Sequence, residues 1–295
     1  ANKWIHHNSP YLTLSLFILS RPKNSQVLIR NFPLEVMKLA ETFWIIDKDN
    51  ETDENHYRSP LNIEHHYGFR EIDLRHNYSP ASAEQSPMYQ LLLVVPHEAI
   101  CFLVKLVNYS IDYCNRYNEI FRSLDTKELI VYNNNGSITQ TGNYVLWGVY
   151  RGAVHVTVSN LLQSLHMALE KYLLELAKYN HKYVTDILDF IMSNSRSVSL
   201  TAVVSSIVMA YPERYWRHAL FLFKTIDFFH YDSVRWQDEN HQTWFINMAA
   251  LQDRDAATER QESAQLDFRK NNLEYLCIRY QYFRTKDLSE TDYTT

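Results

Sequence analysis

The segment from Lys127 to Asn180 decides how we expect this chain to fold, and its sequence is KELIVYNNNGSITQTGNYVLWGVYRGAVHVTVSNLLQSLHMALEKYLLELAKYN. The chain of 295 residues contains 5 glycines, and all of them except Gly68 lie in this segment. Because glycine adopts backbone angles that other residues avoid, we expect the special backbone geometry to be concentrated here. The segment predicts a hairpin, a short helix and a long helix in succession.

The first part of this segment predicts a β-hairpin. Residues that favour strands run from Glu128 to Tyr132 and from Ser137 to Gln140, on either side of an Asn-Gly pair. An Asn-Gly turn between two such runs is the strongest short signal for a hairpin. We therefore expect one hairpin near residues 128–140, followed by helices whose caps are Asn143 or Gly142 and Ser159 or Asn160.

Both sides of this segment are predicted to be helical. Helices at 182–193, 197–211 and 215–229 follow one another at the spacing of helix pairs that stack side by side. We expect an all-α, irregular, solenoid-like array of HEAT- or TPR-like helix pairs, with one inserted hairpin. The expected parts are N-terminal helices over 1–46, a long loop over 47–87, the main array over 88–251, and C-terminal helices with a frayed tail over 252–295. The charged stretch over 252–265 is expected to be a solvated helix face.

Composition excludes several classes of protein. The net charge of −5 gives no general attraction to nucleic acid or to anionic membranes. The longest apolar stretch is interrupted by Pro96, His97 and Lys105, so we expect no membrane span. Three widely spaced cysteines suit free thiols in a reducing cytoplasm. Since the chain begins at Ala1 and enters apolar sequence at once, we expect a fragment of a longer protein.

The sequence contains no motif for a nucleotide, a metal or a catalytic residue. Neither G-x-x-x-x-G-K-[ST] nor G-x-G-x-x-G occurs, so we expect no nucleotide cofactor in this chain. Neither H-E-x-x-H nor a pair of C-x-x-C motifs occurs. The acidic run from Asp47 to Glu54 lacks the glycine and the final glutamate of a calcium loop. We therefore assign no metal site and no catalytic residue.

Two groups of side chains are candidates for binding. The loop over 56–78 interleaves cations with aromatic rings, a mixture that can stack on bases or peptides. Glu64, Glu71 and Asp73 dilute its charge, and a loop that its aromatic rings fold back over the helices is the reading we prefer. Trp147 and Tyr150 are a second candidate platform. The candidate binding residues are His65, His66, Tyr67, Arg70, Arg75, Trp147 and Tyr150.

Glu170 leads to the most specific structural prediction. On a helical wheel from Leu161 onward, Glu170 lies between apolar residues and away from the narrow polar face. A carboxylate is costly to bury unless it is paired. Arg151, which precedes Gly152, is the nearest cation in sequence that could reach it. We therefore predict an Arg151–Glu170 ion pair with a structural role.

Several of these stretches resemble a known family. The hairpin followed by LWGVYRG, NLLQSLHMALEKYLLELA, SVSLTAVVSSIVMAYPE and YWRHALFLFKTIDFFHYDSVRW is similar to the helical region downstream of the NTPase core in large bacterial STAND-type P-loop ATPases. That group contains antiviral sensors. The resemblance covers Met88 to Trp236, and it implies a helical regulatory or sensor segment. It also implies that ATP and Mg²⁺ are bound by a parent protein, outside these residues.

Together these observations favour a non-catalytic helical scaffold or sensor module. Its expected partner is another protein, or the rest of a larger chain in a phage-defence ATPase, and we also consider an oligomer. We do not expect it to bind nucleic acid. The alternative is an enzyme or a nucleic-acid-binding module that uses the loop over 56–78. A deep pocket that joins two or more of His65, His66, Glu170 and Arg151 would favour the enzyme, whereas a broad groove with scattered aromatic rings would favour the binding module.

Overall fold

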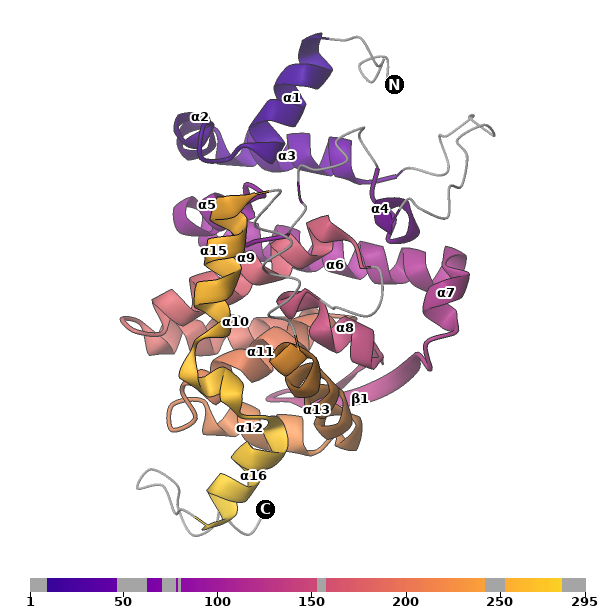
Figure 1. Cartoon of the computed structure of the whole chain (residues 1–295), viewed down its shortest axis with the longest axis vertical. Helices are drawn as coiled ribbons and strands as arrows, with labels where there is room; N and C mark the ends of the chain where they lie inside the picture. Colours follow the sequence, from indigo (N-terminus) through magenta and orange to yellow (C-terminus); the bar gives the residue numbers. More distant parts are fainter. Residues whose placement is uncertain are drawn as a thin grey trace.

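The described part of the chain is mostly helical, with one two-stranded antiparallel hairpin (Figure 1). This computed structural model describes residues 10–46, 63–70, 78, 81–152, 158–241 and 253–282. The all-α class and the hairpin are therefore confirmed. Among the helices of these residues, none has the length and apolar character that crossing a bilayer requires.

Three helices form the end of the molecule that carries the N-terminus, at the top of Figure 1. They are α1 (Pro10–Ser20), α2 (Gln26–Asn31) and α3 (Pro33–Trp44). Pro33 is the first residue of α3, where its fixed φ suits a helix and its missing N–H needs no partner. The inner side of α3 is apolar and buried, and it includes Val36, Ala40 and Trp44.

The expected long loop contains a short helix, α4 (Ile63–His66), within its described residues. After α4 the backbone turns at Gly68, whose φ is +80°. A side chain at Gly68 would collide with the ring of Tyr113, so only glycine fits there. Phe69 then forms an antiparallel bridge with Ile45 and is fully buried. This part of the chain is folded back against the helices, as we expected of its aromatic residues.

The middle of the chain continues through α5 (Met88–Val94), α6 (Pro96–Tyr117) and α7 (Glu119–Arg122) to the hairpin. Strands β1 (Lys127–Asn133) and β2 (Gly136–Gly142) pair from Lys127 with Gly142 to Asn133 with Gly136. The two central residues of the turn are Asn134 and Asn135, and the Asn133 side chain accepts a hydrogen bond from the Asn135 amide at 2.8 Å. Gly136, at φ +125°, opens β2.

The two predicted helix caps are confirmed in the elements that follow the hairpin. These elements are α8 (Tyr144–Gly148), the 3₁₀ helix η1 (Val149–Arg151) and α9 (Asn160–Leu176). Asn143 Oδ1 accepts a hydrogen bond from the Leu146 amide at 2.8 Å, and Ser159 Oγ accepts one from the Leu162 amide at 3.0 Å. Each side chain satisfies a backbone donor that the helix start leaves free.

Helix α11 (Val198–Ala210) lies at the centre of the molecule. Every residue from Val198 to Met209 is buried, because α8, α9, α10 (His181–Asn194) and α12 (Trp216–Phe223) pack around it. A helix that is apolar on all sides belongs to the interior of a domain. Several of its polar groups are matched, as in the 2.7 Å hydrogen bond from Thr201 to Gln140, whereas the buried Ser205 hydroxyl has no partner among the described residues. The expected stacking of helix pairs is not confirmed.

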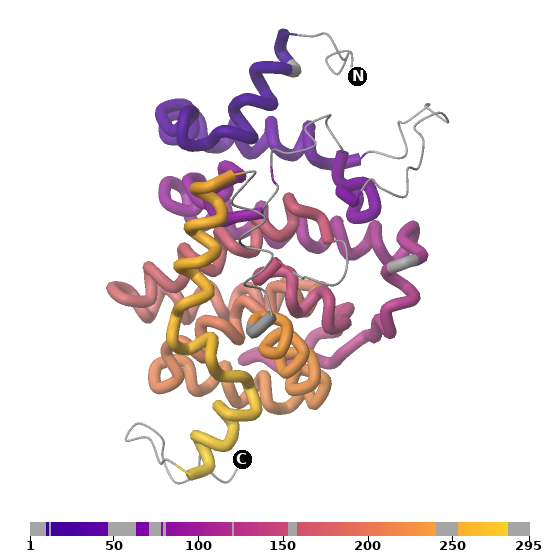
Figure 2. The backbone as a smooth tube through the Cα atoms, viewed as in Figure 1, coloured from indigo at the N-terminus to yellow at the C-terminus, as the bar shows by residue number. Residues whose placement is uncertain are grey.

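The C-terminal segment lies across the helices that precede it. After α13 (Ile226–His241), it consists of α15 (Arg254–Ala264), η2 (Asp267–Lys270) and α16 (Leu273–Tyr282). The yellow tube of Figure 2 runs from the level of α5 and α9 down to α12. This segment therefore covers one side of α9 and brings residues from the end of the chain onto helices from its middle.

Candidate functional site

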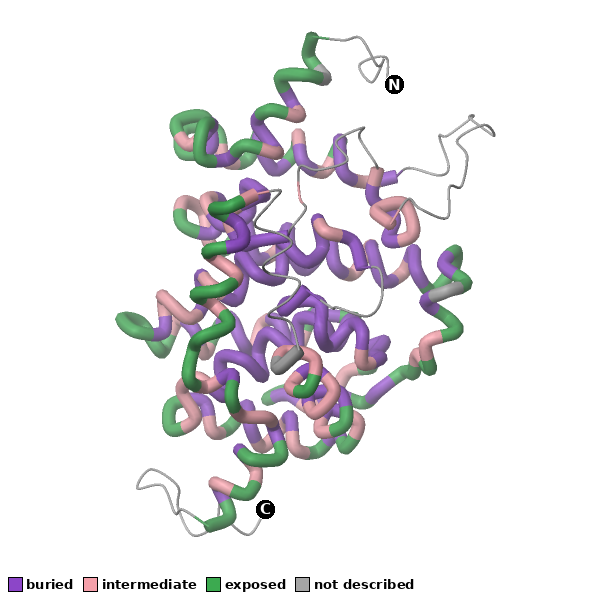
Figure 3. Tube along the Cα trace, viewed as in Figure 1, coloured by how far each residue is buried: buried purple, intermediate pink, exposed green. Residues whose placement is uncertain are grey.

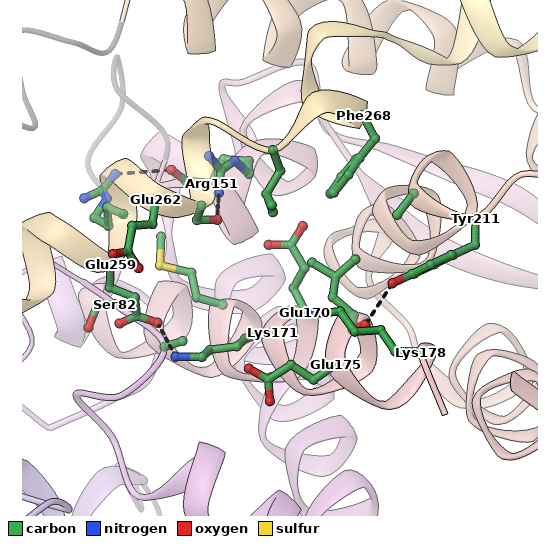
Figure 4. Close-up of a pocket in the computed structure, with 17 residues that line it drawn as sticks. Ser82, Arg151, Glu170, Lys171, Glu175, Lys178, Tyr211, Glu259, Glu262 and Phe268 are labelled. Carbon is green, nitrogen blue, oxygen red and sulfur yellow. Dashed lines mark hydrogen bonds and ion pairs between the residues drawn. The ribbon is translucent and has the colours of Figure 1, made fainter. Parts of the chain in front are cut away.

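A half-open cavity of about 500 Å³ lies between α9, the C-terminal end of α11 and the segment α15–η2 (Figure 4). Its volume is within the range of small-molecule sites, roughly 300–1,000 Å³. The lining residues are Ser82, Ala83, Arg151, Met167, Glu170, Lys171, Leu174, Glu175, Lys178, Ala210, Tyr211, Glu259, Arg260, Glu262, Ser263, Leu266 and Phe268.

One face of α9 forms a wall of this cavity. Its lining residues are spaced at three and four along the helix, which places them on a single face. They are Met167, Glu170, Lys171, Leu174 and Glu175, and Lys178, just after the end of the helix, also lines the cavity. Figure 4 shows the Glu170 carboxylate directed from α9 toward the C-terminal segment, which carries Phe268. The cavity thus exists because α15 and η2 cover this face of α9 without filling it.

A buried ion-pair cluster lies behind the cavity wall. Arg269 Nη2 donates to Glu170 Oε2 at 2.7 Å, and both side chains are buried. Ser206 of α11 donates to the other oxygen of Glu170. The cluster continues from Arg269 to Glu239, whose Oε1 lies 3.9 Å from Arg269 Nη1, and Arg151 donates to that same oxygen.

The cluster extends further into the core through Asp232. Arg235 binds Asp232 at 2.9 Å and Glu239 at 2.7 Å. The indole N–H of Trp147 also donates to Asp232, at 3.0 Å, and the Leu273 amide does so at 2.7 Å. Because buried charges are stable only when they are paired and hydrogen-bonded, this network joins α8, α13 and α16 into one body.

The prediction that Arg151 and Glu170 pair with each other is wrong, because each pairs with a different residue. Glu170 is buried and paired, as we argued, but its cation is Arg269, and the carboxylate bound to Arg151 is that of Glu239. Arg151 and Arg269 both donate to the Ser263 hydroxyl at 3.1 Å, which links the two pairs. Our prediction failed because it chose the nearest cation in sequence, whereas η2 brings Arg269 closer in space.

The surroundings of Glu239 fix its ionisation. Burial alone would raise the pKa of its carboxyl group, but Arg151, Arg235 and Arg269 surround it and lower that pKa to about 2. A carboxylate that stays charged at neutral pH and has three fixed cations cannot serve as a general base. Glu239 is therefore a structural counterion.

Arg260 differs from Arg151, Arg235 and Arg269 in that it forms no ion pair with a carboxylate of the described residues. Its Nη2 donates to the backbone oxygen of Arg151 at 3.2 Å, and no carboxylate among the described residues lies within ion-pair distance of it. Burial and the charge of Arg151 lower the pKa of Arg260 to about 10, against a weaker attraction from Glu259. The guanidinium passes so close to Gly152, at φ +75°, that a side chain there would collide with it.

Charged residues at the mouth of the cavity are partly paired. Lys171 binds Glu84 at 2.6 Å and Glu259 at 3.5 Å. Glu175 accepts a hydrogen bond of 2.6 Å from the Tyr89 hydroxyl. Burial, followed by this hydrogen bond, raises the pKa of the Tyr89 hydroxyl. The mouth therefore has fixed polar groups on the α5 side of α9.

Two of the candidate binding residues, Trp147 and Tyr150, lie in the hydrophobic core and are not exposed at the surface. Trp147 and Tyr150 are fully buried, because η1 and α8 lie beneath α11. The Trp147 ring packs on Phe228 and Tyr231, with ring centroids 4.7 and 6.3 Å away. The proposed platform is therefore part of the core, and its apolar helical pattern was the correct indication.

The candidates in the loop over 56–78 are placed away from the cavity. His65, His66 and Arg70 are half-buried and Tyr67 is buried, while Arg75 lies outside the described residues. None of these residues lines the cavity. Glu64 of the same helix caps α9, since its carboxylate accepts a 2.7 Å hydrogen bond from the Asn160 amide. In the part that is described, α4 supports α9.

Sequence reasoning missed most of the site. The charged stretch over 252–265 was expected to be a solvated helix face, yet Glu259, Arg260 and Glu262 line the cavity. Of the four residues whose meeting would favour an enzyme, Arg151 and Glu170 do line one cavity. Both are held in ion pairs, however, so neither is available as an acid or a base. Across the ranges that the structure describes, no three His, Cys, Asp or Glu side chains are grouped as metal ligands.

Comparison with known proteins gives no family for this chain. No family model matches the sequence, and no curated protein is significantly similar to it. The function proposed below therefore rests on the sequence and on the geometry of its residues.

Proposed function

We propose that this chain is a non-catalytic helical scaffold or sensor module that binds a protein partner through its N-terminal end. The observation that carries this proposal is an exposed apolar surface on α1, α2 and the start of α3, which we call the N-terminal apolar surface. Its large exposed side chains are Tyr11, Leu14, Phe17, Val27, Leu28, Phe32 and Leu34. Figure 3 shows α1 and α2 largely in the colour of exposed residues.

The N-terminal apolar surface is unusual for a surface that faces only water. Helix α1 contains no charged residue along its whole length. Val27 is 76% exposed and Leu14 is 58% exposed. Large exposed apolar side chains on helices that contact one another are typical of sites of interaction with other proteins, since covering them is favoured by the hydrophobic effect.

The partner that this surface fits best is a second copy of the chain. In a symmetric dimer the same patch meets itself, so a patch without charge meets no like charge. The exposed charged residues of α2 and α3 have both signs, with Arg30 and Lys38 positive and Glu35 negative. Opposite charges can therefore face one another around an apolar centre, which is the usual anatomy of a stable interface.

The wider setting of the module follows from the resemblance described above. We place it in the cytoplasm, as the helical sensor segment of a larger STAND-type ATPase of phage defence. In that arrangement ATP and Mg²⁺ are bound by the parent protein, and the helix pairs of this segment form a solenoid-like array. An open reading frame that lacks a P-loop upstream of this segment would contradict this setting.

Sedimentation velocity of the chain over a range of micromolar concentrations tests the partner directly. We expect the wild type to form a dimer as concentration rises, and Val27→Glu to remain a monomer, because a buried charge opposes apolar contact. Ile226→Glu is the matched control, since Ile226 of α13 is 77% exposed and lies outside the N-terminal apolar surface. Leu14→Glu provides a second position within the surface.

The outcomes of this experiment are distinct. A dimer that V27E and L14E both abolish, and that I226E leaves intact, supports the proposal. A wild type that remains a monomer at every concentration overturns the second copy as the partner. A dimer that I226E abolishes in preference to V27E places the interface elsewhere and also contradicts the proposal.

The cavity favours a second function, a module that binds a small molecule. Its residues provide charge and an apolar lining, but Glu170 and Arg151, two of the residues whose meeting would favour an enzyme, are held in buried ion pairs. For that reason we develop it as a binding site and do not assign it an enzymatic reaction.

A further inference from the structure

We propose that the cavity between α9, α11 and α15 binds the carboxylate of a small, largely apolar monocarboxylic acid, with Arg260 as its counterion. This site is separate from the N-terminal apolar surface and does not depend on it. The proposal rests on the position of Arg260 in the cavity wall, on its lack of a carboxylate partner among the described residues and on the lining of the cavity.

Arg260 is set apart by its lack of a carboxylate partner. The buried guanidinium groups of Arg151, Arg235 and Arg269 bind the carboxylates of Glu239, Asp232 and Glu170. Arg260 is half-buried and lines the cavity, and in the described part of the chain no carboxylate lies at ion-pair distance from its guanidinium group. An anion in the cavity could therefore pair with it.

An unmatched cation in this position is costly to the protein alone. Among the described residues, its one hydrogen bond is to the Arg151 backbone oxygen, and a second guanidinium lies nearby. A carboxylate in the cavity would supply the missing charge and accept hydrogen bonds from the guanidinium fork, which matches its geometry. Because Glu175, Glu259 and Glu262 also line the cavity, a ligand with one negative charge fits better than a phosphate monoester, which would bring nearly two.

The rest of the lining determines the body of the ligand. Beside the arginine, the cavity is lined by Met167, Leu174, Leu266 and Phe268. These side chains offer apolar contact to an aliphatic or aromatic group, and Met167 adapts easily to its shape. The remaining carboxylates of the lining, such as Glu259 and Glu262, disfavour a second negative charge on the ligand.

Isothermal titration calorimetry with the full chain tests the proposal, using 4-phenylbutyrate as the probe and its uncharged amide as the matched ligand. We expect the acid to bind at least about tenfold more tightly than the amide, because only the acid neutralises Arg260. Arg260→Gln should remove this preference. Arg254→Gln should retain it, because Arg254 is an exposed residue of the same helix outside the cavity.

Two further measurements keep the test independent of folding. Without ligand, R260Q should melt at a higher temperature than the wild type, since it removes a half-buried charge that has no carboxylate partner. Leu174→Trp, which fills the cavity and leaves Arg260 in place, should abolish binding of both ligands. If the acid and the amide bind equally, or if neither binds the wild type, the proposal is wrong. Tighter binding of phenyl phosphate than of 4-phenylbutyrate would overturn the assignment of a carboxylate.

Discussion

Glu170 on α9 and Arg269 in η2 form a buried ion pair with 2.7 Å between Oε2 and Nη2, although 99 residues separate them in the chain. Their contact fastens the C-terminal segment to the middle of the molecule and closes one end of the cavity. Three elements meet at Glu170, because Ser206 of α11 binds its other oxygen. The fold and the candidate site therefore depend on the same pair.

Breaking this pair should destabilise the protein unequally from its two sides. Arg269→Met leaves the Glu170 carboxylate buried with only a hydroxyl partner, and we expect a loss of roughly 3–5 kcal/mol in the free energy of unfolding. Glu170→Gln should cost less, since Arg269 still has Glu239 at 3.9 Å. Urea unfolding monitored by circular dichroism measures both losses.

Lys270→Met is the control for these two variants. Lys270 pairs with Asp267 in the same element, but both side chains are exposed to solvent. Because water screens such a pair, its loss should change stability far less than R269M does. Equal losses for K270M and R269M would show that the buried pair has no special importance.

The pairing of Glu170 shows where sequence reasoning succeeds and where it stops. The wheel of α9 indicated that this carboxylate is buried and paired, and the hairpin and the caps at Asn143 and Ser159 followed from local signals. Such features depend on residues within a few positions of one another. Arg269 could not be found in this way, since nothing local to α9 specifies which distant segment covers it.

The polar composition of α15 misled us for a related reason. Arg254 and Asp255 are exposed, as expected of a solvated helix, and only Ala256 and Ala257 are buried. The face of α15 that carries Arg260 nevertheless lines the cavity between α9, α11 and α15. Periodicity separates polar from apolar faces, but a cavity with charged walls has the same pattern as a face in water.

His166 should make stability depend on pH. This buried imidazole lies 2.8 Å from both the Leu162 oxygen and the Ser199 hydroxyl, and burial lowers its pKa from 6.5 to about 4. The unfolded chain therefore binds a proton at a higher pH than the folded chain does. Stability should fall as pH drops below 6.5, with a loss of roughly 3 kcal/mol by pH 4.

Urea unfolding of His166→Gln over the same pH range isolates this effect. The variant should lack the part of the loss that begins near pH 6.5. Glu239 contributes in a lower window, because its carboxylate stabilises the fold above the unfolded pKa, near 4.5, and this contribution disappears as pH falls toward about 2. If H166Q and the wild type lose stability in parallel between pH 6.5 and pH 4.5, His166 is not the group responsible.

Gly152 and Gly136 form a matched pair for testing close packing. Both have positive φ, at +75° and +125°, so alanine is strained at either position. Only Gly152 has close neighbours, Arg260 and Gln163, whereas nothing lies within 4 Å of a side chain at Gly136. We expect Gly152→Ala to lower the melting temperature more than Gly136→Ala. An equal effect would mean that the backbone angle alone decides the cost.

The measurement that tests the proposed function most directly is amide hydrogen exchange of the full chain at low and high concentration. Exchange slows where association suppresses local opening. The account predicts that concentration slows exchange in α1, α2 and the first turn of α3, and leaves α12 and α16 unchanged. Exchange that does not depend on concentration, or protection centred on α12 or α16, would contradict an interface at the N-terminal apolar surface.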